Sequence, residues 1–187
     1  PHVFEPICPG AWEDIVNLGQ FWNSDALAAR RAEIEQLNRE KRDSYRRAYR
    51  YLSGFGDMRA NRDSLVAPHI NRKKIAALAQ KLLKDLPDGD FYLAEPALMH
   101  SVGMRGEVGL DTYFYQAKEI HIVADCYGGA QYLMKELGKL AVEKCLSIRI
   151  SHDPVEAEKI DGLFFCGSGL AFAVCPEEEC DYPHHRI

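Results

Sequence analysis

One segment of the chain, residues 119–150, limits the fold more than any other. It begins with a β-branched run from Glu119 to Asp125, followed by a Gly-containing turn and apolar residues spaced three to four apart. A second hydrophobic run, Leu146 to Ile150, comes next. The segment predicts a strand, a helix and a second strand, parallel to the first and reached by a right-handed crossover.

The neighbouring segments predict further strands. Hydrophobic runs at residues 162–166 and 170–174 flank a Gly-Ser-Gly turn, and short aromatic-rich runs at residues 91–93 and 110–115 resemble two more strands. Strands joined to a helical segment in this order are typical of a mixed α/β domain. We therefore expect an α/β fold with a mostly parallel central sheet and flanking helices.

The N-terminal part has a different pattern. Residues 1–22 are rich in Pro and aromatic side chains, which indicates an extended segment. Asn23 or Ser24 is a good N-cap for a first helix, which Gly54 and Gly56 are expected to end. Between residues 30 and 50 of this helix, eight Arg and Lys against four Asp and Glu give a local charge of +4. This pattern predicts a solvated face with local ion pairs, or alternatively a contact to phosphate or an acidic partner.

A second helix is predicted after Asn71, with an apolar stripe that ends before Pro87. Together the two helices resemble a helical hairpin. We therefore divide the chain into residues 1–88, the Pro/aromatic segment with the hairpin, and residues 89–187, the α/β domain.

Composition excludes several classes of protein. The 187 residues carry 23 Lys and Arg against 28 Asp and Glu, a net charge of −5, so there is no overall basic excess for nucleic acid. The longest apolar run, residues 162–175, is interrupted and shorter than the roughly 20 residues of a membrane helix. Six scattered cysteines favour reduced thiols and a cytoplasmic protein. Because the chain starts at Pro1, we expect a fragment or processed product.

The turn between the predicted strand and helix is the main candidate site. A phosphate-binding loop at this place needs glycines, a Lys for the outer phosphates and a Ser or Thr for magnesium. Here Gln131 stands in place of the Lys, Tyr132 in place of the hydroxyl residue and Asp125 in place of the first glycine. The turn is therefore either an ordinary connection or a residual site for ATP, another nucleotide or phosphate. The residues of that residual site are Gly128, Gly129, Ala130, Gln131 and Tyr132.

The opening sequence PHVFEPICPGAWEDIVNLGQFWNS resembles a bacterial family of tandem-repeat P-loop ATPase-like proteins, in which two nucleotide-binding halves are fused. The resemblance implies that residues 1–88 are the tail of a first half and residues 89–187 a second, P-loop-NTPase-like half with a degenerate Walker A loop. It further implies a non-catalytic half with an interface or regulatory role and no catalytic residues or bound cofactor. Its partner would be another P-loop-like half or a second copy of the chain.

A zinc site is the alternative from a different class. Cys175, Cys180 and His184, with His185 beside them, have the Cys-x4-Cys-x3-His spacing, and thiolate with imidazole is a ligand set that zinc prefers. This spacing predicts a zinc-stabilised interaction module, against the simpler interpretation of an exposed acidic tail. Elsewhere, Asp153 follows a predicted strand and precedes Pro154, which favours a helix-capping role.

Overall fold

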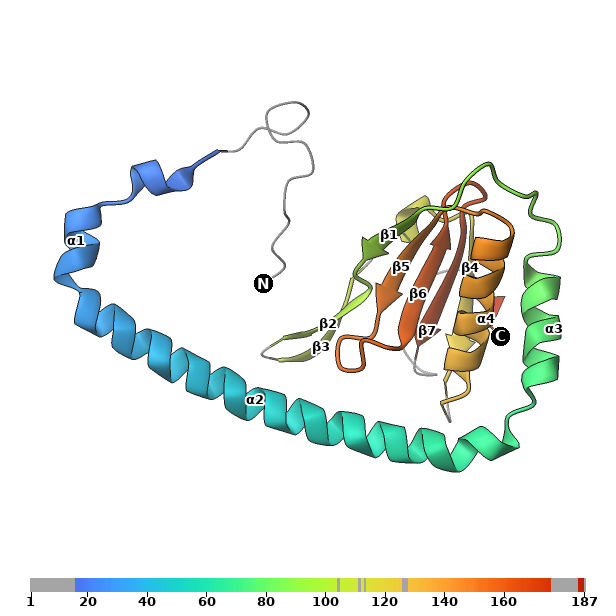
Figure 1. The fold of residues 1–187 in the computed structure, drawn as a ribbon, viewed down its shortest axis with the longest axis horizontal. Coiled ribbons are helices and arrows are strands. Elements are labelled where there is room, and N and C mark those ends of the chain that lie inside the picture. Colours follow the sequence, from blue (N-terminus) through green and yellow to red (C-terminus); the bar gives the residue numbers. More distant parts are fainter. Residues whose placement is uncertain are drawn as a thin grey trace. The chain divides into compact units, whose positions relative to one another are not determined.

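The computed structural model describes residues 16–103, 105–110, 112, 114–125, 128–175 and 185–186. The chain divides into two units between Tyr49 and Arg50, and each is described by itself. Within the described residues no helix has the length and apolar character needed to cross a membrane. The structure confirms a mixed α/β architecture with a long N-terminal helix (Figure 1).

The first unit is helical over its described residues. A short 3₁₀ helix, η1 (Leu18–Phe21), is followed by α1 (Ser24–Ala29) and by the beginning of α2 (Arg31–Val66). Asn23 accepts a hydrogen bond from the Ala26 N–H at 3.0 Å, which confirms the predicted N-cap. None of these three helices has a fully buried residue, so the part of them that lies in the first unit is stabilised by local interactions.

The prediction that Gly54 and Gly56 end the first helix is wrong, because α2 continues to Val66. A glycine that ends a helix adopts a positive φ, and neither residue does. Each glycine costs about 1 kcal/mol relative to alanine inside a helix, which a 36-residue helix tolerates. The helix ends instead before Pro68, since the residue preceding a proline is disfavoured in helical conformation.

Helix α3 (Arg72–Leu82) belongs to the second unit. Its predicted cap is confirmed, since Asn71 accepts from the Lys74 N–H at 3.1 Å. The apolar stripe of α3, with the buried Ala79 and the buried C-cap residue Leu83, packs against α4 (Ala130–Glu143) and its core (Figure 1). The hairpin prediction is therefore wrong in its pairing, because the apolar stripe of α3 has α4 as its partner.

The sheet of the second unit was predicted to be mostly parallel, and it is a mixed sheet in which the parallel pairs outnumber the antiparallel ones. Its strand order is β1-β5-β6-β7-β4-β8, in which β6 is antiparallel to both neighbours and the other adjacent pairs are parallel. Strands β4 and β5 have the same direction and are joined through α4, but β6 and β7 lie between them. The strands are β1 (Ala94–Ala97), β4 (Glu119–Ala124), β5 (Ile148–His152), β6 (Ile160–Phe165), β7 (Leu170–Cys175) and β8 (His185–Arg186).

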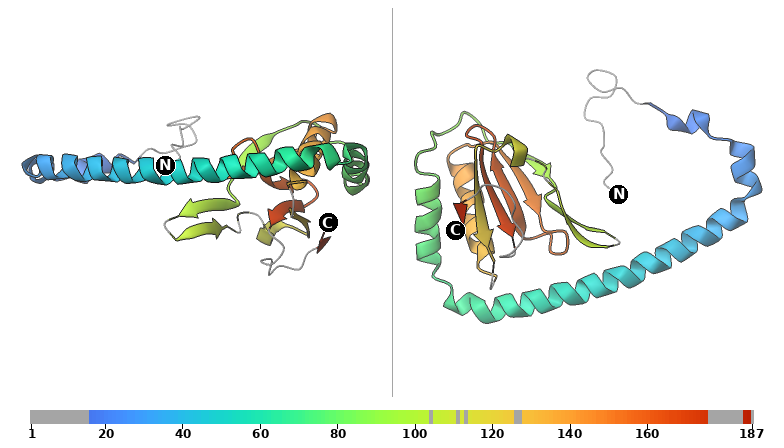
Figure 2. Two further views of the ribbon diagram at one scale, coloured as in Figure 1. Left: turned by 90° about the horizontal axis from the view of Figure 1, so that it is seen from below. Right: turned by 180° about the vertical axis from the view of Figure 1, so that it is seen from behind.

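Alternate residues of the central strands face opposite sides of the sheet. Leu163, Phe165 and Phe172 lie in the core shared with α3 and α4. Phe164 and Ala171 lie in a second core on the other face. Both faces are therefore covered, which explains the nearly continuous hydrophobic runs of β6 and β7. Figure 2 shows α4 lying along one face of this sheet.

Two predicted strands are wrong. Residues 91–93 contain no strand, and the chain enters the sheet at β1, an edge strand that tolerates Pro96. The described residues within 110–115 form a turn and the start of η3 (Phe114–Gln116). The chain between them instead forms a hairpin of β2 (His100–Gly103) and β3 (Gly106–Gly109). Its glycines indicated loops in the sequence, but they lie within the paired strands.

Candidate functional site

The carboxyl ends of the parallel strands meet at one edge of the sheet, where open α/β sheets bind ligands. Asp125 follows β4 and Asp153 follows β5, and His100 begins β2 just after β1. Strand β6 runs in the opposite direction, so it starts at this edge with Asp161 as its second residue. A cavity of about 490 Å³, which we call the edge cavity, lies among these four residues.

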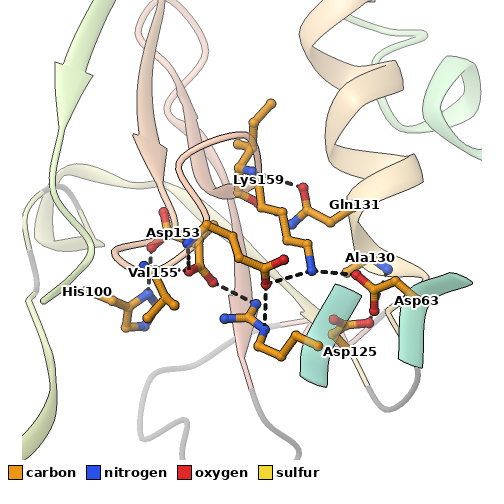
Figure 3. Close-up of polar contacts among 12 residues, drawn as sticks. Asp63, His100, Asp125, Ala130, Gln131, Asp153, Val155 and Lys159 are labelled. Carbon is orange, nitrogen blue, oxygen red and sulfur yellow. Dashed lines mark hydrogen bonds and ion pairs between the residues drawn. The ribbon is translucent and has the colours of Figure 1, made fainter. Parts of the chain in front are cut away.

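The last turns of α2 reach the same edge through Arg59. Its guanidinium lies 2.7 Å from Asp153 Oδ2 and 2.8 Å from Glu156 Oε2 (Figure 3). All three side chains are mostly buried, and Arg59 is 21% exposed. Charge-assisted contacts away from solvent are the stronger kind of ion pair, so Arg59 joins α2 firmly to the segment after β5.

Lys159 and Arg62 extend these contacts toward α4. The Lys159 ammonium bonds Asp63 of α2 and lies 2.8 Å from Glu156 Oε2. Arg62 lies 2.8 Å from Asp63 Oδ1 and 3.7 Å from Asp125 Oδ2. The cations and carboxylates therefore alternate along the edge. We call this network the ion-pair cluster, which consists of Arg59, Arg62, Asp63, Asp153, Glu156 and Lys159.

The cluster shifts the acidity of its members. Burial alone would raise the pKa of Asp63, but hydrogen bonds from Lys159 and Arg62 outweigh burial, and the pKa is lowered. The pKa of Asp153 is also lowered, because bonds from Arg59 and two backbone N–H groups outweigh its burial. Both carboxylates are therefore anionic at neutral pH and compensate the cations beside them.

The loop predicted as a phosphate site does connect a strand to a helix at the sheet edge. Within the described part of this loop, Gly128 has a φ of +80°, and a Cβ added there would lie 2.2 Å from Asp63 Oδ1. Asp125 Oδ1 accepts from the Ala130 N–H at 3.3 Å. Two carboxylates of the chain itself therefore lie at the N-terminus of α4, where a bound phosphate would receive N–H bonds (Figure 3).

The remaining loop residues make structural contacts. The buried Gln131 amide donates to the Ile160 carbonyl at 3.0 Å and accepts from the Ile160 N–H at 2.9 Å. The Tyr132 ring lies under the Arg72 guanidinium, 4.9 Å from its centroid, in a cation–π contact. Gly129 is the N-cap of α4 and makes no side-chain cap bond. Gln131 and Tyr132 therefore join α4 to β6 and α3.

The predicted helix-capping role of Asp153 is wrong, because a turn and no helix follows β5, and Asp153 caps backbone N–H groups of that turn. Its Oδ1 accepts from the N–H groups of Val155 and Glu156, both at 2.9 Å. Its other oxygen binds Arg59, so one carboxylate serves two elements. Nearby, His100 Nδ1 lies 3.0 Å from Asp161 Oδ2, and this hydrogen bond raises the pKa of His100 despite its burial.

Most of the predicted zinc site falls outside the described residues. Cys175 ends β7 and lines the edge cavity, whereas Cys180 and His184 are among the residues not described. The backbone of His185 pairs with β4. Over the described ranges no group of three His, Cys, Asp or Glu side chains could hold a metal ion.

The residues that α2 contributes to the ion-pair cluster were not predicted from the sequence. Arg59, Arg62 and Asp63 lie beyond the predicted end of the first helix, so they were not placed on any element. A helix continued through Gly54 would have shown that positions 59, 62 and 63 share one face. Lys159 gives no such signal, because it lies in a turn whose position depends on the sheet.

Known proteins offer no guide to this site. Comparison of the chain with models of protein families, with curated proteins and with solved structures found no match. The function is therefore argued from the geometry of the sheet edge.

Proposed function

We propose that residues 89–187 are a P-loop-NTPase-like module that does not catalyse, and that its former phosphate edge serves as an interface for helix α2. The observation that carries this proposal is the pair of carboxylates at the N-terminus of α4. Asp63 lies against Gly128, and Asp125 accepts from Ala130 N–H. An incoming phosphate would meet both charge repulsion and a filled space there.

The side chains at the two catalytic loop positions support the same conclusion. The side-chain amide of Gln131 uses both its nitrogen and its oxygen to bond the backbone of Ile160, and the Tyr132 ring stacks with Arg72. A lysine that reaches outer phosphates and a small hydroxyl that holds magnesium are both replaced by groups that stabilise packing. The arrangement favours an architectural use of α4 over phosphoryl transfer.

The ion-pair cluster suggests what the edge does instead. Arg59 and Asp63 come from α2, and their partners Asp153, Glu156 and Lys159 lie in the segment between β5 and β6. The cluster therefore holds the end of a long helix on the edge at which a nucleotide hydrolase would bind its substrate. In the proposed role the module positions α2 for a partner, which is another P-loop-like half or a second copy of the chain.

Calorimetry with Mg·ATP, Mg·ADP and inorganic phosphate tests this function. We expect no saturable heat at millimolar concentrations, since each anion must displace a carboxylate that belongs to the chain. The matched variants are Asp63→Asn, at the α4 N-terminus, and Asp85→Asn, on an exposed turn. Saturable binding of Mg·ATP to the wild-type protein would refute the proposal. Hydrolysis of Mg·ATP by the wild-type protein above the rate measured without protein would also refute it.

A further inference from the structure

The first region of α2 has a basic surface that its own ion pairs do not neutralise. Residues 39–49 contain four Arg and one Lys against Glu40 and Asp43, which leaves an excess of three positive charges. Every residue from 35 to 51 is exposed. The net charge of −5 describes the chain as a whole, whereas this segment attracts anions locally.

Three of these arginines share one face of the helix, which we call the arginine face. Arg39, Arg42 and Arg46 are three and four residues apart and span about 10 Å along the helix axis. Among the described residues Arg42 has no hydrogen-bond or ion-pair partner. Arg39 contacts the neutral Gln36, and the pair between Arg46 and Asp43 is exposed. All three guanidiniums can therefore turn to an incoming anion and lose little by doing so.

Two exposed tyrosines lie beside the arginine face. Tyr45 and Tyr49 are four residues apart, and their rings are stacked with centroids 6.1 Å apart. The two side chains are 54% and 62% exposed. Aromatic rings stabilise a protein mainly by being buried, so this pair contributes little to the fold and is open to a planar ligand.

The residue types indicate which anion fits this surface. Four of the five cations are arginines, whose planar guanidinium binds phosphate through two parallel N–H bonds. A helix that lies on a membrane places Leu, Phe or Trp opposite its charged face, and an acidic peptide needs only the charge. Arginines beside stacked aromatic rings are instead typical of surfaces that bind unpaired nucleotides.

We propose that residues 39–49 bind a single strand of nucleic acid. The arginine face donates hydrogen bonds to its phosphates, and the rings of Tyr45 and Tyr49 stack with its bases. This inference concerns the first unit of the chain and does not depend on the function proposed for residues 89–187.

Fluorescence anisotropy of the full chain with labelled oligo(dT) and oligo(U) of about 20 nucleotides tests the proposal. We expect saturable binding with a micromolar Kd at about 0.1 M NaCl. The logarithm of the association constant should fall with log[NaCl] at a slope of about −2, as expected for three phosphates of a single strand. Tighter binding of oligo(U) would identify RNA as the ligand, and tighter binding of oligo(dT) would identify DNA.

Two matched pairs of variants locate the surface. Arg42→Gln should weaken binding about fivefold and make the salt slope shallower by about 0.7. Arg47→Gln removes the same charge about 140° around the helix and should weaken binding less than about twofold. Tyr49→Ala should weaken binding at least about fivefold, whereas Tyr51→Ala, on nearly the opposite face, should change it less than about twofold. Equal losses within either pair would overturn the proposal.

A change in the ligand separates stacking from charge attraction without altering the protein. A strand of abasic deoxyribose phosphates keeps every charge but has no bases, so it should bind at least about fivefold more weakly than oligo(dT). Equal binding of these two strands, or equally tight binding of labelled poly-glutamate, would show attraction by charge alone and would overturn the proposal. The absence of saturable binding at protein concentrations up to about 0.1 mM would also overturn it.

Discussion

Helix α2 carries arginines of two kinds, and the difference between its two regions shows how position determines what a charge does. In its first region Arg31 pairs with Glu35 and Arg46 with Asp43, four and three residues away, and Arg31 is 81% exposed. In its last turns Arg59 is 21% exposed and pairs with Asp153, 94 residues away. Exposed local pairs contribute little to stability, whereas a buried pair that loses one member leaves an uncompensated charge.

The two regions of α2 also differ in whether their ion pairs can be predicted from the sequence. The local ion pairs predicted for the first helix are confirmed by the contacts of Arg31 and Arg46. The contacts of Arg59, in contrast, join residues that are far apart in the chain. A change at the sheet edge can therefore be compared with the same change at an exposed position.

The largest effect is expected for a lysine at the position where a P-loop would have one. Gln131→Lys should destabilise the protein by about 3 kcal/mol, because it buries an ammonium group and removes the acceptor for the Ile160 N–H. Gln36→Lys, on the exposed face of α2, should change stability by less than about 0.5 kcal/mol, since Lys can still pair with Glu40. Urea unfolding followed by circular dichroism measures both.

The Gln131→Lys variant also tests the proposed function of the loop. If position 131 serves packing, the variant gains no affinity for Mg·ATP. A Gln131→Lys protein as stable as the wild type and able to bind Mg·ATP would show that the loop is an open phosphate site that merely lacks its cation.

The second prediction concerns the arginines themselves. Arg59→Met should lower the free energy of unfolding by about 2 kcal/mol, because Asp153 and Glu156 lose their shared cation in a mostly buried place. Arg46→Met should cost less than about 0.5 kcal/mol, because the Arg46–Asp43 pair is exposed. Thermal and urea unfolding test the difference. Similar losses from the two variants would remove the distinction between the two regions of α2.

The cluster adds a dependence on acidic pH that Arg59→Met should reduce. Asp153 has a lowered pKa in the folded protein, so its contribution to stability is present above the unfolded value of 3.8. That contribution is lost as the pH falls through the lower, folded value. The gap in stability between wild type and Arg59→Met should therefore narrow in strong acid.

A pair of glycines gives the third prediction. Gly128→Ala should destabilise by about 1–2 kcal/mol, because its φ is +80° and the new Cβ would lie 2.2 Å from Asp63 Oδ1. Gly54→Ala should stabilise by about 0.5–1 kcal/mol, since the site is helical and open to solvent. The two variants should thus shift the midpoint of urea unfolding in opposite directions. A stabilising Gly128→Ala would mean that Asp63 does not lie against this loop.

These residues also show what the sequence could and could not predict. The helix after residue 129, the Asn23 and Asn71 caps and strands β4, β6 and β7 follow from local periodicity and capping chemistry, and the structure confirms them. The order of β6 and β7 between β5 and β4 depends on long-range pairing, which periodicity does not encode.

The end of α2 was also predicted wrongly, because the prediction used only local signals in the sequence. Glycine is a weak helix breaker, and the contacts made by the last turns of α2 outweigh its cost of about 1 kcal/mol. The cluster itself could not be predicted from the sequence, because Arg59 is 94 residues from Asp153 and Asp63 is 96 residues from Lys159. Their meeting depends on where the sheet places the segment after β5.

The smallest effect is expected for His100, the titratable cation of the edge cavity. Its hydrogen bond to Asp161 raises its pKa above the ordinary value of 6.5, burial opposes this, and the charges of Asp161, Glu107 and Asp153 raise it further. A raised pKa means that the stabilisation is complete below the unfolded value and is lost as the pH rises through the folded value. The wild-type protein should therefore lose stability relative to His100→Gln as the pH rises above 6.5, because Gln does not titrate. His69→Gln, a change at an exposed position that keeps the His100 pair, should retain the wild-type decline. Urea unfolding at a series of pH values measures these differences, and a wild-type advantage that grew with pH would show that His100 does not bind Asp161 as a cation.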